Sequence, residues 1–451
     1  MGHMTSAVPG FLWPLAELVI ALNQNLVKSD ASRILTILER QALAMLHELV
    51  YRREKDFYAE SAQNNDNTLG IMTSGGTLSN LCALWVARNA SLGRSENFEG
   101  VEAAGISAAL AHYGCEKAVV LASKFAHYSI QKAVGILGLG ERGLISIPVD
   151  QRGKMRVDQL RSQVAECRRR NWRVIAIVGT AGTTDCGSID DLLEIGSIAR
   201  EASIHFHVDA AWGIPLLFSR NHRAKLAGID LADTVAADGH KQLHLPIGNS
   251  VLLLRDPQVG AVIEKHSRYM LQQGSGDLGQ RSVEGSRSGS GFLFHAALHV
   301  IGAEGYACLV DESIRKTQVM IKRIGQMPEF DLLVTPETNI VLYRYIPARL
   351  RWAVDDGRLT VQQNNWINEL NQRIQLRQYE EGRAFVSRTT VDNIGILNGM
   401  PVLALRAVLA NPLIRDEDIE YLLRDQIEIA LRLDAGEAGP TNGRYGTVAA
   451  T

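Results

Sequence analysis

Short apolar runs separated by helical stretches occupy the chain between residues 68 and 255. These runs are "KAVVLAS", "GLISIPV", "RVIAIVG", "IHFHV" and "SVLLL". Continuous apolar runs of this length are typical of strands that helices cover on both faces, and such strands form parallel or mostly parallel sheets. In these sheets, ligands bind at the carboxyl ends of the strands. The sequence therefore predicts an α/β domain with its functional site along that edge.

The hydrophobic pattern divides the chain of 451 residues into four segments. Residues 1–60 are predicted to form a helical arm, because "ILTILERQALAMLHELVYRR" places apolar residues at three- and four-residue steps. Residues 61–310 form the large α/β domain. Residues 311–435 form a small α+β domain with strands at "NIVLYRYI", "RAFVSRTTV" and "PVLALRAVLAN", and residues 436–451 form a loose tail.

Composition and charge exclude several classes of partner. A net charge of −2 leaves no basic surplus for nucleic acid or an anionic membrane surface. The apolar stretch "FLWPLAELVIALNQNLV" contains Glu17 and two asparagines, so it is too interrupted to span a membrane, and it lacks the basic leader of a secretory signal. Five scattered cysteines without a CxxC pair argue against disulfides and zinc. We therefore expect a cytoplasmic protein without a metal site.

The stretch "TSGGTLSN", residues 73 to 80, places a glycine pair at the start of the helical "LSNLCALWVARN". Glycines allow the backbone to approach an anion closely, and Ser74, Thr77 and the first free amides of the helix can donate hydrogen bonds to phosphate oxygens. The alternative is an ordinary turn between a loop and a helix. The motif indicates a phosphate site only in combination with others.

Two further motifs follow strands directly. His127 in "SKFAHYS" comes after "KAVVLA", and Asp209 in "HVDAAWG" ends an apolar strand. A carboxylate in that position must be paired or functional. A core or surface histidine and a structural turn aspartate are the alternatives. Both side chains are expected at the carboxyl edge of the sheet.

His240 and Lys241 lie in "AADGHKQLHLPIGNSVLLLRD", just before a run typical of a buried strand. A buried ammonium is costly unless it is paired, so Lys241 either belongs to a basic loop end or has its amine consumed in a covalent bond. Asp209 and Lys241 are 32 residues apart (241 − 209), with the strand-like "DTVAAD" between them. Both therefore emerge on the same edge. Pyridoxal 5'-phosphate needs this geometry, because a lysine forms the imine with its aldehyde and an aspartate keeps its pyridine nitrogen protonated.

Five motifs occur in one order: "TSGGT", "HYS", "GTAGTTDCGSID", "HVDAAWG" and "DGHKQL". In this order, over roughly residues 15 to 430, the chain resembles the group II amino-acid decarboxylases, a pyridoxal-phosphate family with glutamate, aspartate, sulfinoalanine and aromatic amino-acid members. The resemblance implies the PLP-dependent transferase type I (aspartate aminotransferase-like) fold, with a mostly parallel seven-stranded sheet flanked by helices. It also implies an amino-acid substrate and a homodimer whose active sites lie at the subunit interface.

The resemblance also implies a role for each motif residue. Lys241 is the Schiff-base lysine, His127 stacks on one face of the cofactor ring with Ala211 on the other, and Asp209 pairs with the pyridine nitrogen. Thr183 or Thr184 lies near the phenolic oxygen of the cofactor or the substrate carboxylate. The residues assigned to the phosphate are Ser74, Gly75, Gly76, Thr77 and His240.

The proton donor departs from the family pattern. Many members use a tyrosine on a mobile loop, but there is no tyrosine between Met270 and "EGSRSG". Tyr269, just before this region, is one candidate. His127 and a loop residue from a partner subunit are the alternatives.

Arg406 and Arg287 are candidates for binding a substrate carboxylate, because a planar guanidinium suits bidentate binding. Structural ion pairs are the alternative for both, and Arg287 can instead organise a subunit interface. The arm and the "TSGGT" region look most like the branch of the family that converts L-aspartate to β-alanine and CO2. L-Glutamate, which differs by one methylene, is the closest alternative, followed by sulfinoalanine, diaminobutyrate and aromatic amino acids.

Other reaction classes use the same cofactor scaffold. An aminotransferase or a carbon–sulfur lyase would require the same lysine and aspartate, since the outcome depends on which substrate bond lies perpendicular to the ring. A degenerate fold kept as a binding subunit is the non-enzymatic alternative. The intact lysine, aspartate and histidine favour an enzyme.

Overall fold

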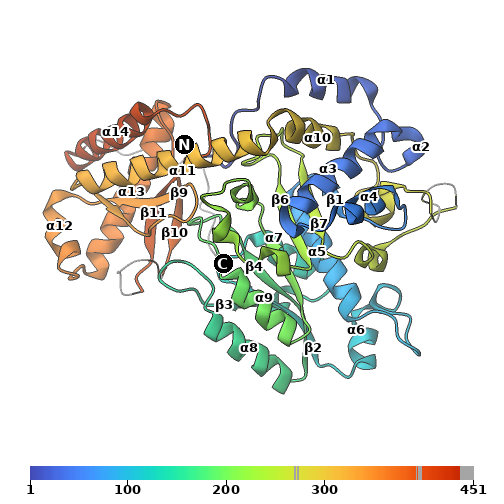
Figure 1. Ribbon diagram of the computed structural model, residues 1–451. Coiled ribbons are helices and arrows are strands. Elements are labelled where there is room, and N and C mark those ends of the chain that lie inside the picture. The colour runs from blue at the N-terminus through green and yellow to red at the C-terminus, as the bar shows by residue number, and fades with distance from the viewer. Residues whose placement is uncertain (269–270, 272–273, 393, 395–398, 437–451) are drawn as a thin grey trace. The chain divides into compact units, whose positions relative to one another are not determined.

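The computed structural model describes residues 1–268, 271, 274–392, 394 and 399–436 (Figure 1). The chain forms two compact units. The larger unit comprises residues 5–311, and the smaller unit comprises residues 1–4 together with residues from 312 onward. Helix α11 (Gly302–Gln326) continues from the larger unit into the smaller one.

A seven-stranded sheet forms the centre of the larger unit, with the strand order β1-β7-β6-β5-β4-β2-β3. Strands β3, β2, β4, β5 and β6 run parallel to one another, and β7 is antiparallel to both β6 and β1. The predicted α/β class with a mostly parallel seven-stranded sheet is therefore confirmed. The strands are β1 (Gly70–Thr73), β2 (Lys117–Ser123), β3 (Leu144–Ile147), β4 (Trp172–Thr180), β5 (His205–Asp209), β6 (Thr234–Asp238) and β7 (Ser250–Leu254).

Helices flank this sheet. Helix α5 packs across β1 and β4 to β7 and against α7, while α8 and α9 pack on β3, β4 and β5. The helices are α1 (Leu12–Leu22), α2 (Ser29–Ser32), α3 (Ile34–Tyr51), α4 (Lys55–Gln63), α5 (Gly76–Ser91), α6 (Val101–His112), α7 (Tyr128–Ile136), α8 (Val157–Arg169), α9 (Leu192–Glu201) and α10 (Gly291–Val300). The 3₁₀ helices are η1 (Glu141–Gly143), η2 (Ile214–Leu217), η3 (Arg223–Leu226), η4 (Ile229–Leu231), η5 (Val259–Ile263) and η6 (Leu278–Arg281).

Six strands of the larger unit end on one edge of the sheet. Strands β2, β3, β4, β5 and β6 are parallel, and β1 runs in the same direction because β1 and β6 are both antiparallel to β7. In this register Ser250 pairs with the last residue of β1 on one side and the last residue of β6 on the other. The strand ends on this edge are Thr73, Ser123, Ile147, Thr180, Asp209 and Asp238. The loops that carry the motifs start here.

The smaller unit contains an antiparallel sheet with the order β10-β11-β9-β8. Tyr343 and Leu405 of this sheet and Leu422 of α14 belong to one buried apolar cluster. The elements are β8 (Phe330–Leu332), β9 (Ile340–Tyr345), β10 (Ser387–Val391), β11 (Val402–Val408), α12 (Ala348–Asp355), α13 (Val361–Glu381) and α14 (Asp416–Asp434). Among the helices that the structure describes, no single one is long and apolar enough to cross a membrane, and α10 with α11 meets that length and apolarity only as a sharply bent pair.

His47 is a titratable group in the core of the larger unit. Its side chain is fully buried, with Nε2 3.0 Å from the Leu254 carbonyl oxygen and Nδ1 3.0 Å from the Tyr58 hydroxyl. A carbonyl oxygen can only accept, so Nε2 carries a hydrogen. Burial lowers the pKa of His47 to about 4, so the ring is neutral near pH 7.

We expect acid to destabilise the larger unit through His47. The unfolded chain takes up the proton near pH 6.5 but the folded protein only near pH 4. The contribution of the neutral His47 to the free energy of unfolding is therefore fully present above pH 6.5 and is lost as the pH drops towards 4. A shift of this size corresponds to about 3 kcal/mol. Urea unfolding from pH 7 to 4.5 should show a shallower loss in His47→Gln than in the wild type. The same substitution at the half-exposed His266 should leave the slope unchanged.

Candidate active site

A cavity of about 310 Å³ lies at the edge where these strands end. It gathers residues from the loops after β1, β2, β4, β5 and β6, far apart in sequence. The predicted site residues that line it are Ser74, Gly75, Gly76, Thr77, His127, Thr184, Asp209, Ala211, His240 and Lys241. The topology of the sheet therefore brings together all five motifs that were singled out in the sequence.

The glycine pair provides an open helix N-terminus at this cavity. Gly75 is the N-cap of α5, and in the described chain no side chain caps this terminus. A Cβ on Gly75 would meet nothing within 4 Å, whereas a Cβ on Gly76 would lie 2.7 Å from Asp238 Oδ1. The backbone therefore approaches Asp238 more closely than any other residue type would allow, and the first amides of the helix are available for an anion.

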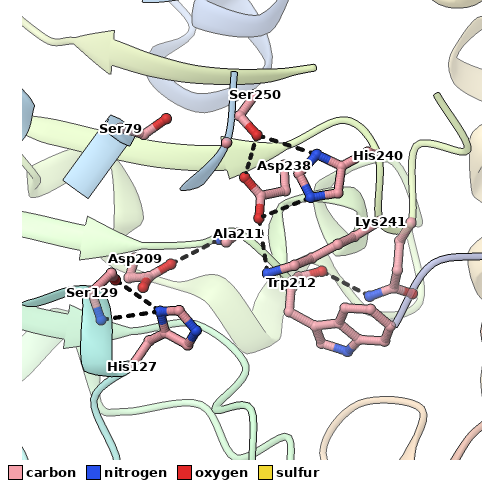
Figure 2. Close-up of polar contacts among 12 residues, drawn as sticks. Ser79, His127, Ser129, Asp209, Ala211, Trp212, Asp238, His240, Lys241 and Ser250 are labelled. Carbon is pink, nitrogen blue, oxygen red and sulfur yellow. Dashed lines mark hydrogen bonds and ion pairs between the residues drawn. The ribbon is translucent and has the colours of Figure 1, made fainter. Parts of the chain in front are cut away.

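Lys241 is paired with Asp238 in this cavity. Its Nζ lies 2.9 Å from Asp238 Oδ2, and the Ser250 hydroxyl donates to Oδ1 at 2.5 Å. The Asp238 side chain is 4% exposed and that of Lys241 is 17% exposed. His240 lies beside them, with Nε2 3.8 Å from Asp238 Oδ2 and Nδ1 3.1 Å from the Asn249 carbonyl oxygen (Figure 2). The ammonium is thus compensated by a buried carboxylate with a fixed orientation.

Asp209 and His127 form a second group in the cavity (Figure 2). The Asp209 carboxylate accepts from the Ala211 backbone N–H at 3.1 Å and from Asn80 Nδ2 at 2.9 Å. His127 is the N-cap of α7, and its Nδ1 lies 2.8 Å from the Ser129 hydroxyl. Burial lowers the pKa of His127, and the nearby Asp209 partly opposes this shift. The imidazole is therefore neutral near pH 7.

The two threonines that the sequence proposed as alternatives occupy different environments. Thr183 is fully buried inside its loop, where its hydroxyl lies 3.0 Å from Ser188 Oγ and accepts from the Ser188 N–H at 3.1 Å. Thr184 lines the cavity. The structure thus places Thr184 where it can contact a ligand and Thr183 where it stabilises the loop.

The two candidate arginines do not line this cavity. The side chain of Arg287 is 9% exposed and forms a bidentate ion pair with Glu39, with Nη1 2.7 Å from Oε2. Arg406 lies on β11 in the smaller unit, where its Nη1 donates to Ser387 Oγ at 2.9 Å. Tyr269 lies outside the described residues. Substrate binding by Arg287 or Arg406 and proton donation by Tyr269 stay predictions.

Three residues that the sequence analysis did not single out lie at the site. Asp238 pairs with Lys241, while Asn80 and Ser129 contact Asp209 and His127. Asp238 stands three residues before the lysine at the end of a strand, and Ser129 stands two residues after His127, so both had a local signal. Asn80 lies at the end of "TSGGTLSN", but its contact with Asp209 is 129 residues away in sequence and could not be predicted from the motif.

The residues at this edge fit pyridoxal 5'-phosphate. The uncapped terminus of α5 and His240 suit a phosphate, the Lys241 amine suits an aldehyde, and Asp209 can accept from a protonated pyridine nitrogen. A Cβ added to Gly75 would meet no atom within 4 Å, so there is open space beside this glycine. Fold and site together define the class of enzymes that use this cofactor.

Comparisons with known proteins identify the family within this class. Residues 11–346 match the model described as the pyridoxal-dependent decarboxylase conserved domain. Aspartate 1-decarboxylase of Aliivibrio fischeri is 42% identical over 434 residues, which cover 95% of this chain and 79% of the relative. L-2,4-diaminobutyrate decarboxylase of Rhizobium meliloti is 33% identical over 353 residues, 77% of this chain and 64% of the relative.

The fold agrees with that of a solved structure. The crystal structure of mouse CSAD superposes with a TM-score of 0.82 at 23% identity, and the match covers 95% of this chain and 83% of the mouse chain. The chain belongs to the pyridoxal-dependent decarboxylase family. It is therefore a PLP-dependent carboxy-lyase, as the five motifs predicted.

The close approach of Gly76 to Asp238 is testable without the cofactor. In Gly76→Ala the new methyl would force the Asp238 carboxylate to move, so we expect the free energy of unfolding of the apoprotein to fall by about 1–3 kcal/mol. Gly75→Ala puts its methyl into open space and should stay within about 0.5 kcal/mol of the wild type. Equal losses in the two variants, measured by urea unfolding, would contradict this geometry.

Proposed function

We propose that this protein catalyses the α-decarboxylation of L-aspartate to β-alanine and CO2. The observation that carries the proposal is the 42% identity to an aspartate 1-decarboxylase over 95% of the chain. The site supports it, because the lysine, the aspartate and the anion-binding terminus that the cofactor needs line one cavity. When bound, pyridoxal phosphate supplies the electron sink that accepts the electrons of the breaking bond to the carboxylate carbon.

We assign a role to each side chain of the cavity. Lys241 holds the cofactor covalently through its amine, and Asp238 fixes the position of that amine with a contact of 2.9 Å. Asp209 accepts the hydrogen of the pyridine nitrogen, and His127 packs on the ring. The terminus of α5 at Gly76 binds the phosphate, together with His240.

The second carboxylate of an acidic substrate needs a cation. Arg406 is the better supported of the two candidate arginines, because Arg287 already donates two hydrogen bonds to Glu39. Arg406 is buried on β11, and its planar guanidinium suits bidentate binding of a carboxylate.

L-2,4-Diaminobutyrate is the second candidate substrate. It is favoured by the relative that is 33% identical over 77% of this chain. Its side chain ends in an ammonium group, so it would need carboxylates or carbonyl oxygens where aspartate needs an arginine. The two substrates therefore require opposite charges at the same end of the pocket.

The amine products decide between these substrates. We expect the cofactor-loaded protein, incubated separately with L-aspartate, L-glutamate, sulfinoalanine, L-2,4-diaminobutyrate and L-tyrosine, to release mainly β-alanine from aspartate. Mass spectrometry of the products measures this. Lys241→Ala should give no product, and borohydride should fix the cofactor to the wild type but not to this variant. Release of 1,3-diaminopropane as the main product would instead identify diaminobutyrate as the substrate.

We also propose that the protein is a cytoplasmic homodimer. Helix α1 exposes several large apolar side chains, and a second copy of the chain is the partner that would cover them. The five cysteines are unpaired, which is typical of a reducing compartment. The exposed residues of α1 are Trp13 (65%), Leu18 (44%), Ile20 (76%) and Leu22 (45%).

Light scattering tests the homodimer. We expect twice the chain mass of 49.5 kDa for the wild type and the single-chain mass for the Trp13→Asp, Ile20→Asp double variant. Leu413→Asp, at a residue that is 72% exposed in the smaller unit, is the control and should remain dimeric. A fully active wild-type monomer would contradict the proposal.

A further inference from the structure

Asn80 lies on α5 one turn after Gly76, and its side chain is 1% exposed. Its carboxamide makes three contacts with side chains of other elements. Nδ2 donates to Asp209 Oδ2 and to Ser129 Oγ, both at 2.9 Å, and Oδ1 lies 2.9 Å from His207 Nε2. One buried amide thus joins the partner of the pyridine nitrogen to the residue that contacts His127.

The chemistry of the partners fixes the direction of these hydrogen bonds. The Asp209 carboxylate can only accept, so the amide nitrogen of Asn80 faces it and the amide oxygen faces His207. The oxygen in turn requires a hydrogen on Nε2 of His207. The orientation of the amide therefore follows from the carboxylate.

His207 supports Asn80 from behind. The ring is fully buried, and burial lowers its pKa, so it is neutral and its Nδ1 accepts a hydrogen bond. The Thr234 hydroxyl, 2.9 Å from Nδ1, supplies the hydrogen, and the Thr234 carbonyl oxygen lies farther away at 3.2 Å. A hydrogen on Nδ1 would instead leave two acceptors, Nε2 and the Asn80 oxygen, facing each other at 2.9 Å.

The other branch of the network ends at His127. Its Nδ1 lies 3.3 Å from the Ser129 backbone nitrogen and 2.8 Å from the Ser129 hydroxyl oxygen. A backbone N–H can only donate, so Nδ1 accepts from it and carries no hydrogen, and the Ser129 hydroxyl therefore also donates to Nδ1. The hydrogen of the neutral ring is therefore on Nε2, which lies on the side of the ring away from Ser129 (Figure 2).

We propose that Asn80 is a positioning residue that orients the carboxylate of Asp209 and, through Ser129, holds His127 as the neutral tautomer with its hydrogen on Nε2. The proposal rests on the cofactor chemistry of the family, but not on which amino acid is decarboxylated. Asn80 thereby links the two residues that contact the cofactor ring.

The neutral tautomer with its hydrogen on Nε2 restricts the proton transfers that His127 can make. Its Nε2–H can donate a hydrogen bond into the cavity, but a neutral imidazole that gave up this proton would become an anion. To act as an acid, the ring would first need a second proton on Nδ1, which faces the two donors of Ser129. The charged groups that act on the ring are Asp209, Lys241, Asp238 and Asp185, and burial, the largest influence, opposes protonation. The proton that replaces CO2 therefore comes from another group.

Nitrogen NMR of 15N-histidine-labelled holoprotein at pH 7.5 reads the tautomer directly. We expect His127, assigned by the signals lost in His127→Asn, to show a hydrogen-bearing Nε2 and a bare Nδ1. His207 should show the same tautomer. A doubly protonated His127, or one with its hydrogen on Nδ1, would overturn the proposal.

Asn80→Asp tests the part played by the amide. The oxygen that replaces the amide nitrogen has at most one proton, which it shares with the Asp209 carboxylate, so the Ser129 hydroxyl turns to it and no longer donates to His127. We expect the Nδ1 signal of His127 to shift, because this nitrogen then accepts only from the Ser129 backbone N–H at 3.3 Å. Asn89→Asp is the matched control, because Asn89 is a buried asparagine of the same helix that donates to Glu102, and it should leave His127 unchanged.

If Asn80→Asp does not fold, Ser129→Ala gives the same information. Loss of the hydroxyl removes the donor at 2.8 Å and leaves the backbone N–H at 3.3 Å, so we expect the Nδ1 signal of His127 to shift in the same direction. An unchanged His127 spectrum in either folded variant would contradict the proposal. A holoprotein with the expected tautomer but a substrate other than aspartate would disprove the proposed function and leave this inference intact.

Discussion

The ion pair between Lys241 and Asp238 is the interaction on which the rest of the site depends. An ammonium at the buried edge of a sheet is unfavourable unless a carboxylate compensates it, and removing one partner of such a pair is strongly destabilising. Asp238 is held by the Ser250 hydroxyl and by the close approach of Gly76. The register of β6 with β7 and the start of α5 are therefore both coupled to the position of one amine.

Much of the fold was predictable because the sheet is made of apolar runs that can form little else. The strands at "KAVVLAS", "RVIAIVG" and "SVLLL" lie where their hydrophobicity predicts. Strand β1 was not predicted, because "GIMT" has four residues and becomes a strand only by pairing with β7. The motifs likewise predicted the cavity, since parallel strands bring their carboxyl ends together. They did not predict the partner of Arg287, because Glu39 is 248 residues away in sequence.

The type of reaction and the choice of substrate depend on different physical features of the site. The reaction requires a lysine, an aspartate and an anion site at fixed places on the sheet, and a chain 23% identical to this one keeps the same fold. The substrate depends on the charge at the far end of a small pocket, where one arginine or one carboxylate reverses the preference. A pattern of strands and motifs therefore predicts the type of reaction but says little about the substrate.

Helix α5 carries Gly76 at its first position and Asn80 four residues later. Four residues advance a helix by about 6 Å and bring the chain back to nearly the same face. The helix end proposed for the phosphate and the amide proposed to orient Asp209 are thus separated by a single turn of one helix. Insertion or deletion of one residue in this turn would rotate Asn80 by about 100° away from Asp209. The length of this turn therefore matters as much to the proposed site as the side chains it carries.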